Sequence, residues 1–234
     1  MPDASSEIPF HNRKELVLQT PSAAPRNCYM CGRTDKPLTK DHVIPKVLFP
    51  RPRPHNLITE DACEACNNSF SKDDEMFALY LSAALGRNSA GAWVWANAIV
   101  ARTLPRSRPL ATKVLADMTK AKILTELGLA DVDILRIPQD RLERVLFRIA
   151  KGLVRHLQPV INPVALKFAS ERLWPTSETA NVIQDARQKM MYMELGNGVF
   201  RCLYAFTPEI PRHVMFFFIF YDAVGFVVTG QPSV

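Results

Sequence analysis

The sequence predicts an α+β fold, and three observations lead to this prediction. Two Cys-x2-Cys pairs lie near the N-terminal end, apolar residues recur at helical spacing in the middle of the chain, and short runs of aromatic and β-branched residues follow Pro159. The chain therefore reads as a cysteine-paired module, a helical middle and a small antiparallel β-rich C-terminal part. Because the expected helices outnumber the expected strands, we class the whole as α+β.

The composition is that of an ordinary globular protein. At 234 residues, with 47% hydrophobic and 22% charged residues, the chain can form one sizeable domain or two small ones. The formal net charge of +6 favours a polyanionic partner, although charge alone is a weak indicator. Five cysteines are too few and too clustered for a disulfide scaffold.

Nothing in the sequence indicates export or a membrane span. The first 20 residues contain no apolar core of signal-peptide length, and the longest apolar run, Val214 to Tyr221, is much shorter than the ~20 residues of a membrane-spanning helix. Thiolates kept free for a metal imply a reducing compartment. We therefore expect a cytoplasmic protein with no membrane partner.

The expected organisation has four segments. Residues 1–25 are polar, with scattered Pro, Ser and Ala, and we expect a mobile N-terminal arm. Residues 26–88 form the cysteine-paired module, residues 89–158 the helical region, and residues 159–234 the β-rich C-terminal region.

The module itself is expected to begin as two short strands joined by a proline-rich connection. Four prolines rule out a long helix between His42 and Asn56: Pro45, Pro50, Pro52 and Pro54. A helix should start near Ser71, where Ser71 and Asp74 resemble a capping box and acidic residues fill the first turn.

The remaining elements follow from periodicity and turn residues. Helices are expected over residues 89–103, 111–128 and 140–157. Strands are expected over residues 189–194, 198–206, 213–221 and 225–229, which Gly, Pro and Asp separate.

The two cysteine pairs predict a structural zinc site. Four soft thiolates from Cys28, Cys31, Cys63 and Cys66 suit a closed tetrahedral zinc ion. The 31 residues between Cys31 and Cys63 leave room for a functional loop, and a module of this size would depend on the metal for much of its folding energy. Four reduced cysteines packed as small hydrophobes would not account for the paired spacing. Cys202 stands alone and is expected to be a small buried side chain.

A zinc ion with four thiolate ligands has no open position for water, so catalysis would need a second, harder metal. The carboxylate of Asp41 and the amide oxygen of Asn67 suit Mg2+ or Mn2+. His42 follows Asp41 directly, so on a strand the two side chains point to opposite faces.

The order of these residues resembles the HNH endonuclease family, and within it the branch whose ββα-metal hairpin is braced by a four-cysteine zinc site. The resemblance covers residues 26–75 and rests on the first cysteine pair, Asp41-His42-Val-Ile-Pro45-Lys46, Asn56-Leu57 and Cys63-x2-Cys66-Asn67. It implies an HNH nuclease module over residues 26–88.

The resemblance also implies a role for each matching position. His42 falls where the family places its general base, and Asn56 falls at the residue that pins the loop and orients the histidine. Asp41 and Asn67 fall at the positions that hold the catalytic ion, and family members generally leave 5′-phosphate and 3′-hydroxyl ends. Asn67 stands where histidine is more frequent, which weakens the preference for zinc or nickel as the catalytic ion.

Three acidic residues open a further alternative: Asp73, Asp74 and Glu75 could add a carboxylate to the site, or could simply favour the start of a helix.

Basic residues around the motif indicate where nucleic acid would lie. Lys40, Lys46, Arg51 and Arg53 give the approach to His42 a positive charge and would bind phosphates without sequence preference. A second candidate is the basic side of the 140–157 helix, formed by Arg141, Arg144, Arg148, Lys151 and Arg155, for which a solvated helix face is the alternative. Trp93 and Trp95 could stack on bases or pack in the core.

The sequence therefore predicts a metal-dependent endonuclease that hydrolyses DNA phosphodiesters, with structural zinc and catalytic Mg2+ or Mn2+. The alternatives are a non-catalytic zinc-stabilised module that binds nucleic acid and a scaffold for protein interaction. DNA is the expected partner, and a homodimer or a protein partner is compatible with the sequence.

Overall fold

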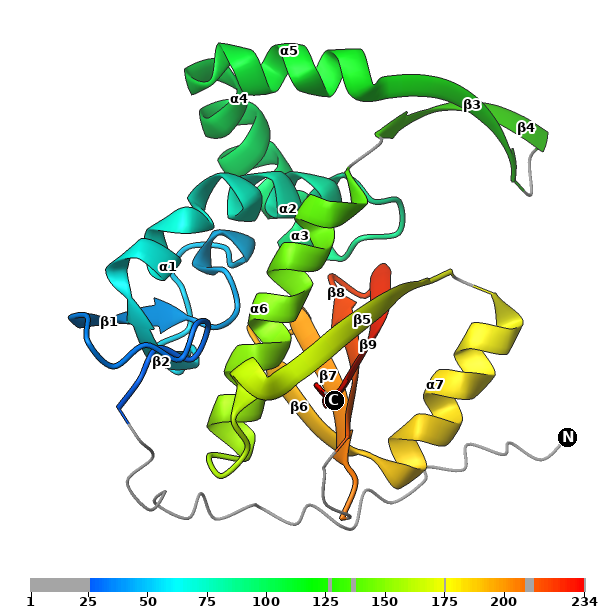
Figure 1. Ribbon diagram of the computed structural model, residues 1–234. Helices are drawn as coiled ribbons and strands as arrows, with labels where there is room; N and C mark the ends of the chain where they lie inside the picture. The colour runs from blue at the N-terminus through cyan, green and yellow to red at the C-terminus, as the bar shows by residue number, and fades with distance from the viewer. Residues whose placement is uncertain (1–25, 126–127, 136–137, 175, 209–212, 234) are drawn as a thin grey trace, which may run out of the picture.

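The computed structural model of the chain describes residues 26–125, 128–135, 138–174, 176–208 and 213–233 (Figure 1). The expected arm over residues 1–25 lies outside the described residues. Helices and antiparallel sheets are combined as predicted, so the α+β class is confirmed.

The cysteine-paired module begins with the predicted hairpin. Strands β1 (Leu38–His42) and β2 (Thr59–Cys63) pair in antiparallel register, with His42 opposite Thr59. Their proline-rich connection contains one short 3-10 turn, η1 (Lys46–Leu48). Helix α1 (Glu64–Ser69) follows β2 directly and packs on both strands, and α2 (Ser71–Ala83) starts at the predicted residue.

The capping box expected at the start of α2 is wrong. Phe70 is the N-cap residue and supplies no side-chain hydrogen bond. The Asp74 carboxylate instead accepts two hydrogen bonds from Arg148, at 2.7 and 3.2 Å. The local pattern predicts a hydrogen bond between the Asp74 carboxylate and the backbone. The charged guanidinium of Arg148, from another helix, forms the stronger bond with this carboxylate.

The helix expected over residues 89–103 is present but changes type. It starts as α3 (Ser89–Trp93) and continues as a π-helical segment, η2 (Val94–Thr103), in which the Leu104 amide donates to the Ile99 carbonyl five residues earlier. Helices α4 (Leu104–Arg106) and α5 (Arg108–Asp117) follow.

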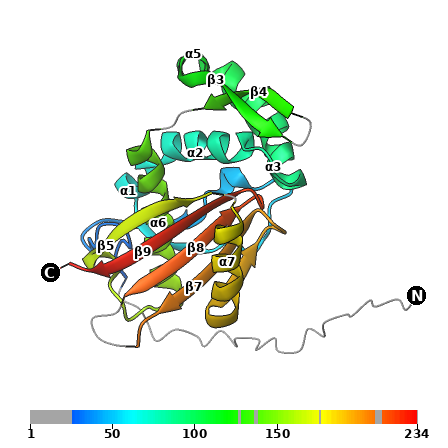
Figure 2. The ribbon, with the colours of Figure 1, turned by 90° about the vertical axis from the view of Figure 1, so that its right-hand side faces the viewer.

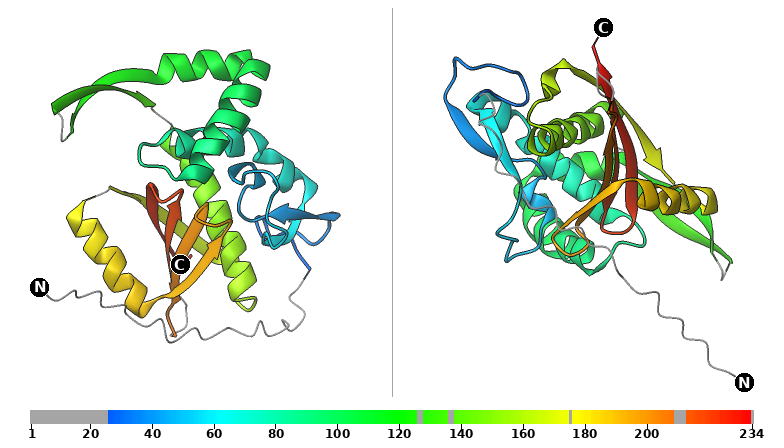
Figure 3. Two further views of the ribbon diagram at one scale, coloured as in Figure 1. Left: turned by 180° about the vertical axis from the view of Figure 1, so that it is seen from behind. Right: turned by 90° about the horizontal axis from the view of Figure 1, so that it is seen from below.

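The helix expected over residues 111–128 is wrong in its second half. Helix α5 ends at Asp117, and strands β3 (Met118–Thr125) and β4 (Gly128–Leu135) form a separate hairpin that projects from the body (Figure 3). Lys120 and Lys122 alternate with apolar residues, and Gly128 has a φ of 111°. Period-two alternation and a glycine turn therefore outweigh the helical spacing.

The C-terminal region forms a five-stranded antiparallel sheet in the order β5-β9-β8-β7-β6. Four of its strands match the prediction: β6 (Met191–Leu195), β7 (Phe200–Phe206), β8 (Val214–Phe220) and β9 (Val224–Pro232). The sequence reading missed β5 (Leu166–Leu173), which follows the 3-10 turn η3 (Pro163–Ala165), and α7 (Ser177–Lys189).

Helices cover both faces of this sheet (Figure 2). The predicted helix α6 (Gln139–Leu157) packs on one face, and α7 packs on the other through a small cluster around Ala186, Leu203 and Phe217. The main core is continuous: it joins Val43 and Ile44 of the module, the buried side of α6, and phenylalanines of β7 and β8. The C-terminal sheet is thus part of the support on which the module rests.

The basic side of α6 is not a free surface for nucleic acid, so that expectation is wrong. Arg148 is 3% exposed and Arg155 is 7% exposed. The basic residues contact groups of the module and of α2: Arg141 and Arg144 contact Asp73, Arg148 contacts Asp74, Lys151 contacts the Met30 carbonyl, and Arg155 contacts Asn27. Among the described residues, no helix is both long and apolar enough to cross a membrane.

Candidate functional site

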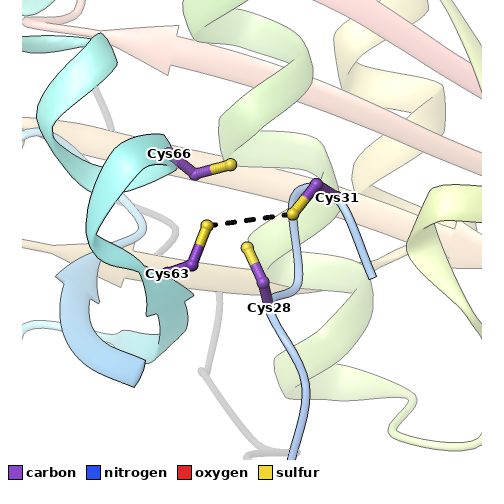
Figure 4. Close-up of side chains that lie close together, drawn as sticks. All are labelled: Cys28, Cys31, Cys63 and Cys66. Atoms are coloured by element: carbon purple, nitrogen blue, oxygen red, sulfur yellow. Dashed lines mark hydrogen bonds between the residues drawn. The ribbon is translucent and has the colours of Figure 1, made fainter. Parts of the chain in front are cut away.

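Four cysteine sulfurs converge between the first loop and the start of α1 (Figure 4). The Sγ atoms of Cys28, Cys31, Cys63 and Cys66 all lie within 4.8 Å of one another. The sulfurs of Cys31 and Cys63 are 3.8 Å apart. Four sulfurs bound tetrahedrally to zinc at about 2.3 Å are separated by about 3.8 Å. The kind, number and spacing of the donors therefore fit a structural zinc ion.

A different backbone conformation brings together the two sulfurs of each cysteine pair. After the first pair, Gly32 has a φ of +77°, and its amide donates to the Cys28 carbonyl at 2.7 Å. This left-handed conformation favours glycine and closes the turn around the first two sulfurs. In the second pair, Cys63 ends β2 and precedes α1, so Cys66 lies within the first helical turn.

The thiols differ in acidity when no metal is bound. Burial raises the pKa of both Cys31 and Cys66. Burial acts in the same direction at Cys28, but backbone amides of Cys63, Cys31 and Met30 bring the pKa of Cys28 down to about 7. Burial disfavours the charged thiolates of Cys31 and Cys66, and a bound divalent cation would stabilise them by supplying the opposite charge.

Asp41 lies in a buried polar cluster. Its side chain is 6% exposed, and the hydroxyl of Tyr29 donates to its Oδ2 atom at 2.6 Å. Burial raises the pKa of Tyr29, with the charge of Asp41 acting in the same direction, so Tyr29 remains a hydrogen-bond donor. Burial also raises the pKa of Asp74 to about 6, an effect that Arg148 opposes and Asp41 adds to. The negative charge of Asp41 therefore acts on Asp74, which Arg148 of α6 holds by an ion pair.

Asn67 contacts the face of β1 on which the Asp41 side chain lies. Its Nδ2 atom donates to the Thr39 hydroxyl at 3.0 Å. Thr39 and Asp41 are two residues apart on β1, so their side chains lie on one face. Within the described structure, Oδ1 of Asn67 and Oδ1 of Asp41 form no hydrogen bond, and oxygen ligands suit a hard divalent ion.

His42 lies at the end of β1 on the opposite face from Asp41. Burial lowers the pKa of His42, and the positive charges of Lys46 and Arg53 lower it further, while Asp41 acts in the opposite direction. A lowered pKa favours the neutral imidazole, which is the form that can accept a proton from water.

Asn56 lies in an exposed turn of the proline-rich connection. Within the described part of the chain, its side chain forms no hydrogen bond. Its role in orienting His42 stays a prediction.

Three of the four expected phosphate-binding cations form one patch beside His42. Lys46, Arg51 and Arg53 are exposed, and Arg53 Nε donates to the Lys46 carbonyl at 2.9 Å. Lys40 differs, because its ammonium group forms an ion pair with Asp61 at 2.7 Å.

The acidic residues at the start of α2 have separate places. Asp73 and Asp74 form ion pairs with arginines of α6. Glu75 instead lines a cavity with Arg51 and Arg53. Among the described residues, the four cysteines form the one group of three or more His, Cys, Asp or Glu side chains close enough to hold a metal.

The structure thus brings the four cysteines together, and it places Asn67 of α1 against Thr39, two residues before Asp41 on β1. In the described structure neither Asp41 nor Asn67 hydrogen-bonds to the other or to His42. The sequence analysis did not single out Tyr29, and it assigned Arg148 to a basic helix face without predicting its contact with Asp74. The position of Tyr29 between Cys28 and Cys31 could have indicated that it lies close to the site. No local pattern indicates that Arg148, 74 residues beyond Asp74, contacts Asp74.

Comparison with known proteins agrees with the motif. Residues 28–78 match the model of the HNH endonuclease family, which covers about a fifth of the chain. The resemblance predicted from both cysteine pairs, Asp41-His42 and Asn67 is confirmed for this segment. No curated protein matches the chain, and no solved structure matches it.

Proposed function

We propose that the protein is a metal-dependent HNH-type endonuclease that hydrolyses DNA phosphodiester bonds. The observation that carries this proposal is the hairpin β1–β2, which the four-cysteine site braces and which presents His42 beside a cationic patch. The segment that contains it is the one that matches the HNH family.

In this proposal each residue has a defined task. A ring nitrogen of neutral His42 accepts the proton of the attacking water. Asp41 and Asn67 would hold Mg2+ or Mn2+ through their oxygen atoms, and the bound ion would supply positive charge at the phosphate during in-line displacement. Tyr29 holds Asp41 in place, and Lys46, Arg51 and Arg53 position the phosphate backbone.

One observation favours a second candidate, a non-catalytic zinc-stabilised module that binds nucleic acid. Asp41 is almost fully buried and bonded to Tyr29, an arrangement that would also serve the stability of the hairpin alone. The two candidates share the zinc site and the cationic patch and differ in whether His42 performs chemistry.

The deciding experiment incubates supercoiled plasmid with the zinc-loaded full-length protein and Mg2+ or Mn2+. His42→Ala is compared with the wild type and with His213→Ala, which removes an exposed histidine from the C-terminal sheet region. Loss of a positioned general base should lower the nicking rate by about 100-fold or more. The control should nick like the wild type, and a DNA ligase should reseal the 5′-phosphate and 3′-hydroxyl ends.

DNA binding is measured in parallel for all three proteins. Binding without cleavage in the wild type would support the non-catalytic candidate. Equal cleavage by wild type and His42→Ala would contradict the assignment of His42, and absence of both binding and cleavage would contradict both candidates.

A further inference from the structure

A cavity of about 430 Å3 lies between the proline-rich connection of the module and the helical segment η2–α4. Its size falls in the range of clefts that hold small organic ligands, about 300–1,000 Å3. Two arginines come from the module, Arg51 and Arg53, and two from the helical side, Arg102 and Arg106. The helical side lies outside the segment that matches the HNH family.

The four arginines lack acidic partners. None of them forms an ion pair with another described residue. The pKa of Arg53 is lowered, first by the partial burial of its side chain and then by the positive charges of Arg51 and Arg102, so these three guanidinium groups repel one another. Such a cluster is stabilised by an anion with several oxygen acceptors, and a phosphate group meets that need.

The same cavity contains an aromatic surface and a carboxylate. Trp93 is 36% exposed and lines the cavity, whereas Trp95 packs against the core. The face of an indole ring can stack on any base. Glu75 also lines the cavity, and a carboxylate can accept a hydrogen bond from the exocyclic amino group of a base.

The π-helical geometry of η2 contributes to this arrangement. The Leu104 amide donates to the Ile99 carbonyl, five residues earlier, and the Thr103 hydroxyl donates to the Ala98 carbonyl at 2.8 Å. Departures of this kind from α-helical geometry are frequent at functional sites. Here the segment carries Arg102 and runs from Trp93 to α4, where Arg106 lies.

Arg53 and Val47 link the cavity to the segment that follows His42. Both residues line the cavity, and Arg53 Nε donates to the carbonyl of Lys46, four residues after His42, at 2.9 Å. A strand whose phosphate reaches His42 could therefore place a neighbouring nucleotide in the cavity.

We propose that this cavity binds one unpaired nucleotide of the nucleic-acid strand next to the cleavage site, with its phosphate on the arginines and its base on Trp93. The inference rests on the proposed nuclease function for the presence of that strand. It predicts that the substrate contains a single-stranded region, because a base within a duplex is stacked and paired and cannot enter a cavity of this kind without being extruded.

The test uses the full-length, zinc-loaded His42→Ala protein, so that binding is measured whether or not the wild type cleaves. Fluorescence anisotropy gives the dissociation constants for a labelled single-stranded oligonucleotide and for its blunt duplex. Arg102→Gln/Arg106→Gln and Trp93→Ala are each added to this background. The matched controls are Arg187→Gln, an exposed arginine of α7, and Trp174→Ala, an indole that is 65% exposed far along the chain.

The arginine double variant should bind the single strand at least about 10-fold more weakly, and the slope of log K against log salt should fall by about 1 to 1.5. Trp93→Ala should weaken single-strand binding by about 5- to 100-fold, and Trp93→Phe should restore part of it. Both effects should be much smaller for the duplex, and the controls should bind like the parent.

Unchanged single-strand binding in the cavity variants would overturn the proposal, as would equal losses for duplex and single strand or for the control variants. Binding of a free mononucleotide as tightly as the oligonucleotide would overturn the assignment to a strand. If the wild type fails to cleave but the binding pattern is as expected, the catalytic proposal fails and the nucleotide site stands.

Discussion

At the scale of single residues, a proposed role and an observed one meet at Asp41. We propose that it holds a metal ion, and the structure shows it accepting a hydrogen bond from the buried hydroxyl of Tyr29. The two roles are compatible, because a carboxylate has a second oxygen and because an outer hydrogen bond commonly orients a metal ligand.

Tyr29→Phe tests this combination. Removing the hydroxyl leaves a buried carboxylate without its donor, which should cost about 1–3 kcal/mol of folding stability. If Asp41 holds the ion, the Mg2+ concentration for half-maximal cleavage should also rise about 10- to 100-fold. Chemical denaturation and metal titrations of plasmid nicking measure the two effects.

Tyr221→Phe is the matched control, because the Tyr221 hydroxyl is equally buried and donates to the Leu48 carbonyl at 2.6 Å. It should lose stability without a change in metal dependence. If both variants require the same Mg2+ concentration as the wild type, the hydrogen bond from Tyr29 does not position Asp41 as a metal ligand.

The residues of the motif could be found from the sequence because their types and order are characteristic over a short segment. Cys28, Cys31, Cys63 and Cys66 come together as their spacing predicts. The contacts that the module forms with the rest of the protein depend on segments far away in the sequence. Arg148 reaches Asp74 from 74 residues away, and Arg102 approaches Arg53 from outside the motif, so neither contact could be predicted.

At the scale of secondary-structure elements, α6 connects the module to the sheet. Its basic side pairs with α2, its apolar side packs on the sheet, and Gly152 faces the chain directly after His42. A Cβ atom at residue 152 would lie 2.6 and 2.7 Å from the two methyl carbons of Val43. The close approach of helix and hairpin therefore requires glycine at this position.

Gly152→Ala should destabilise the protein although alanine is the better helix former. The gain in helix propensity is about 1 kcal/mol, whereas overpacking a buried contact costs about 1–3 kcal/mol. Because Val43 follows His42, the displaced hairpin should also cleave DNA more slowly. Denaturant unfolding and plasmid nicking measure both consequences.

Val43→Ala removes the methyl groups that the new Cβ atom meets. The double variant Val43→Ala/Gly152→Ala should therefore be more stable than the sum of the two single effects predicts. Additive losses would show that the contact between Gly152 and Val43 does not determine the packing of α6 on the hairpin.

Element prediction succeeded where one local pattern was dominant and failed where two competed. The strong apolar stripe of α6 gave its bounds to within one residue. In residues 118–128, by contrast, the apolar positions fit a helix, while the alternation of Lys120 and Lys122 with apolar residues fits a strand. The π-helical geometry of η2 and the strand β5, which the sequence did not predict, depend on packing against other elements. Local sequence patterns carry no information about that packing.

At the scale of the whole molecule, the described residues form one large core, a small cluster near the sulfurs and another small cluster between α7 and the sheet. The main core runs from Val43 through α6 to the sheet. Among the described residues, the cluster near the sulfurs contains five buried ones: Cys28, Tyr29, Met30, Ala62 and Cys63. So small a cluster cannot offset the entropy cost of ordering its loops, so zinc should supply much of that stability.

Removal of zinc should therefore unfold the first loop and the hairpin while the C-terminal sheet stays folded. We expect one zinc ion per chain in the purified protein, since the described residues contain one four-cysteine group. After chelation, hydrogen exchange should become fast in residues 28–42 and 59–69 and remain slow in β7 and β8. Cleavage should be lost, because Asp41 and His42 lie on the hairpin, and Mg2+ without zinc should not restore it.

Cys63→Ser should reproduce the chelated state, because it removes a thiolate that belongs to both β2 and the metal site. Cys202→Ser is the matched control: this thiol is also buried, but it lies on β7 away from the sulfur cluster. It should keep a full zinc content and slow exchange in the hairpin, with at most a modest loss of overall stability. Slow exchange in the hairpin of the chelated protein would show instead that contacts with α6 suffice to hold Asp41 and His42, and that the four sulfurs are not needed for the fold of the site.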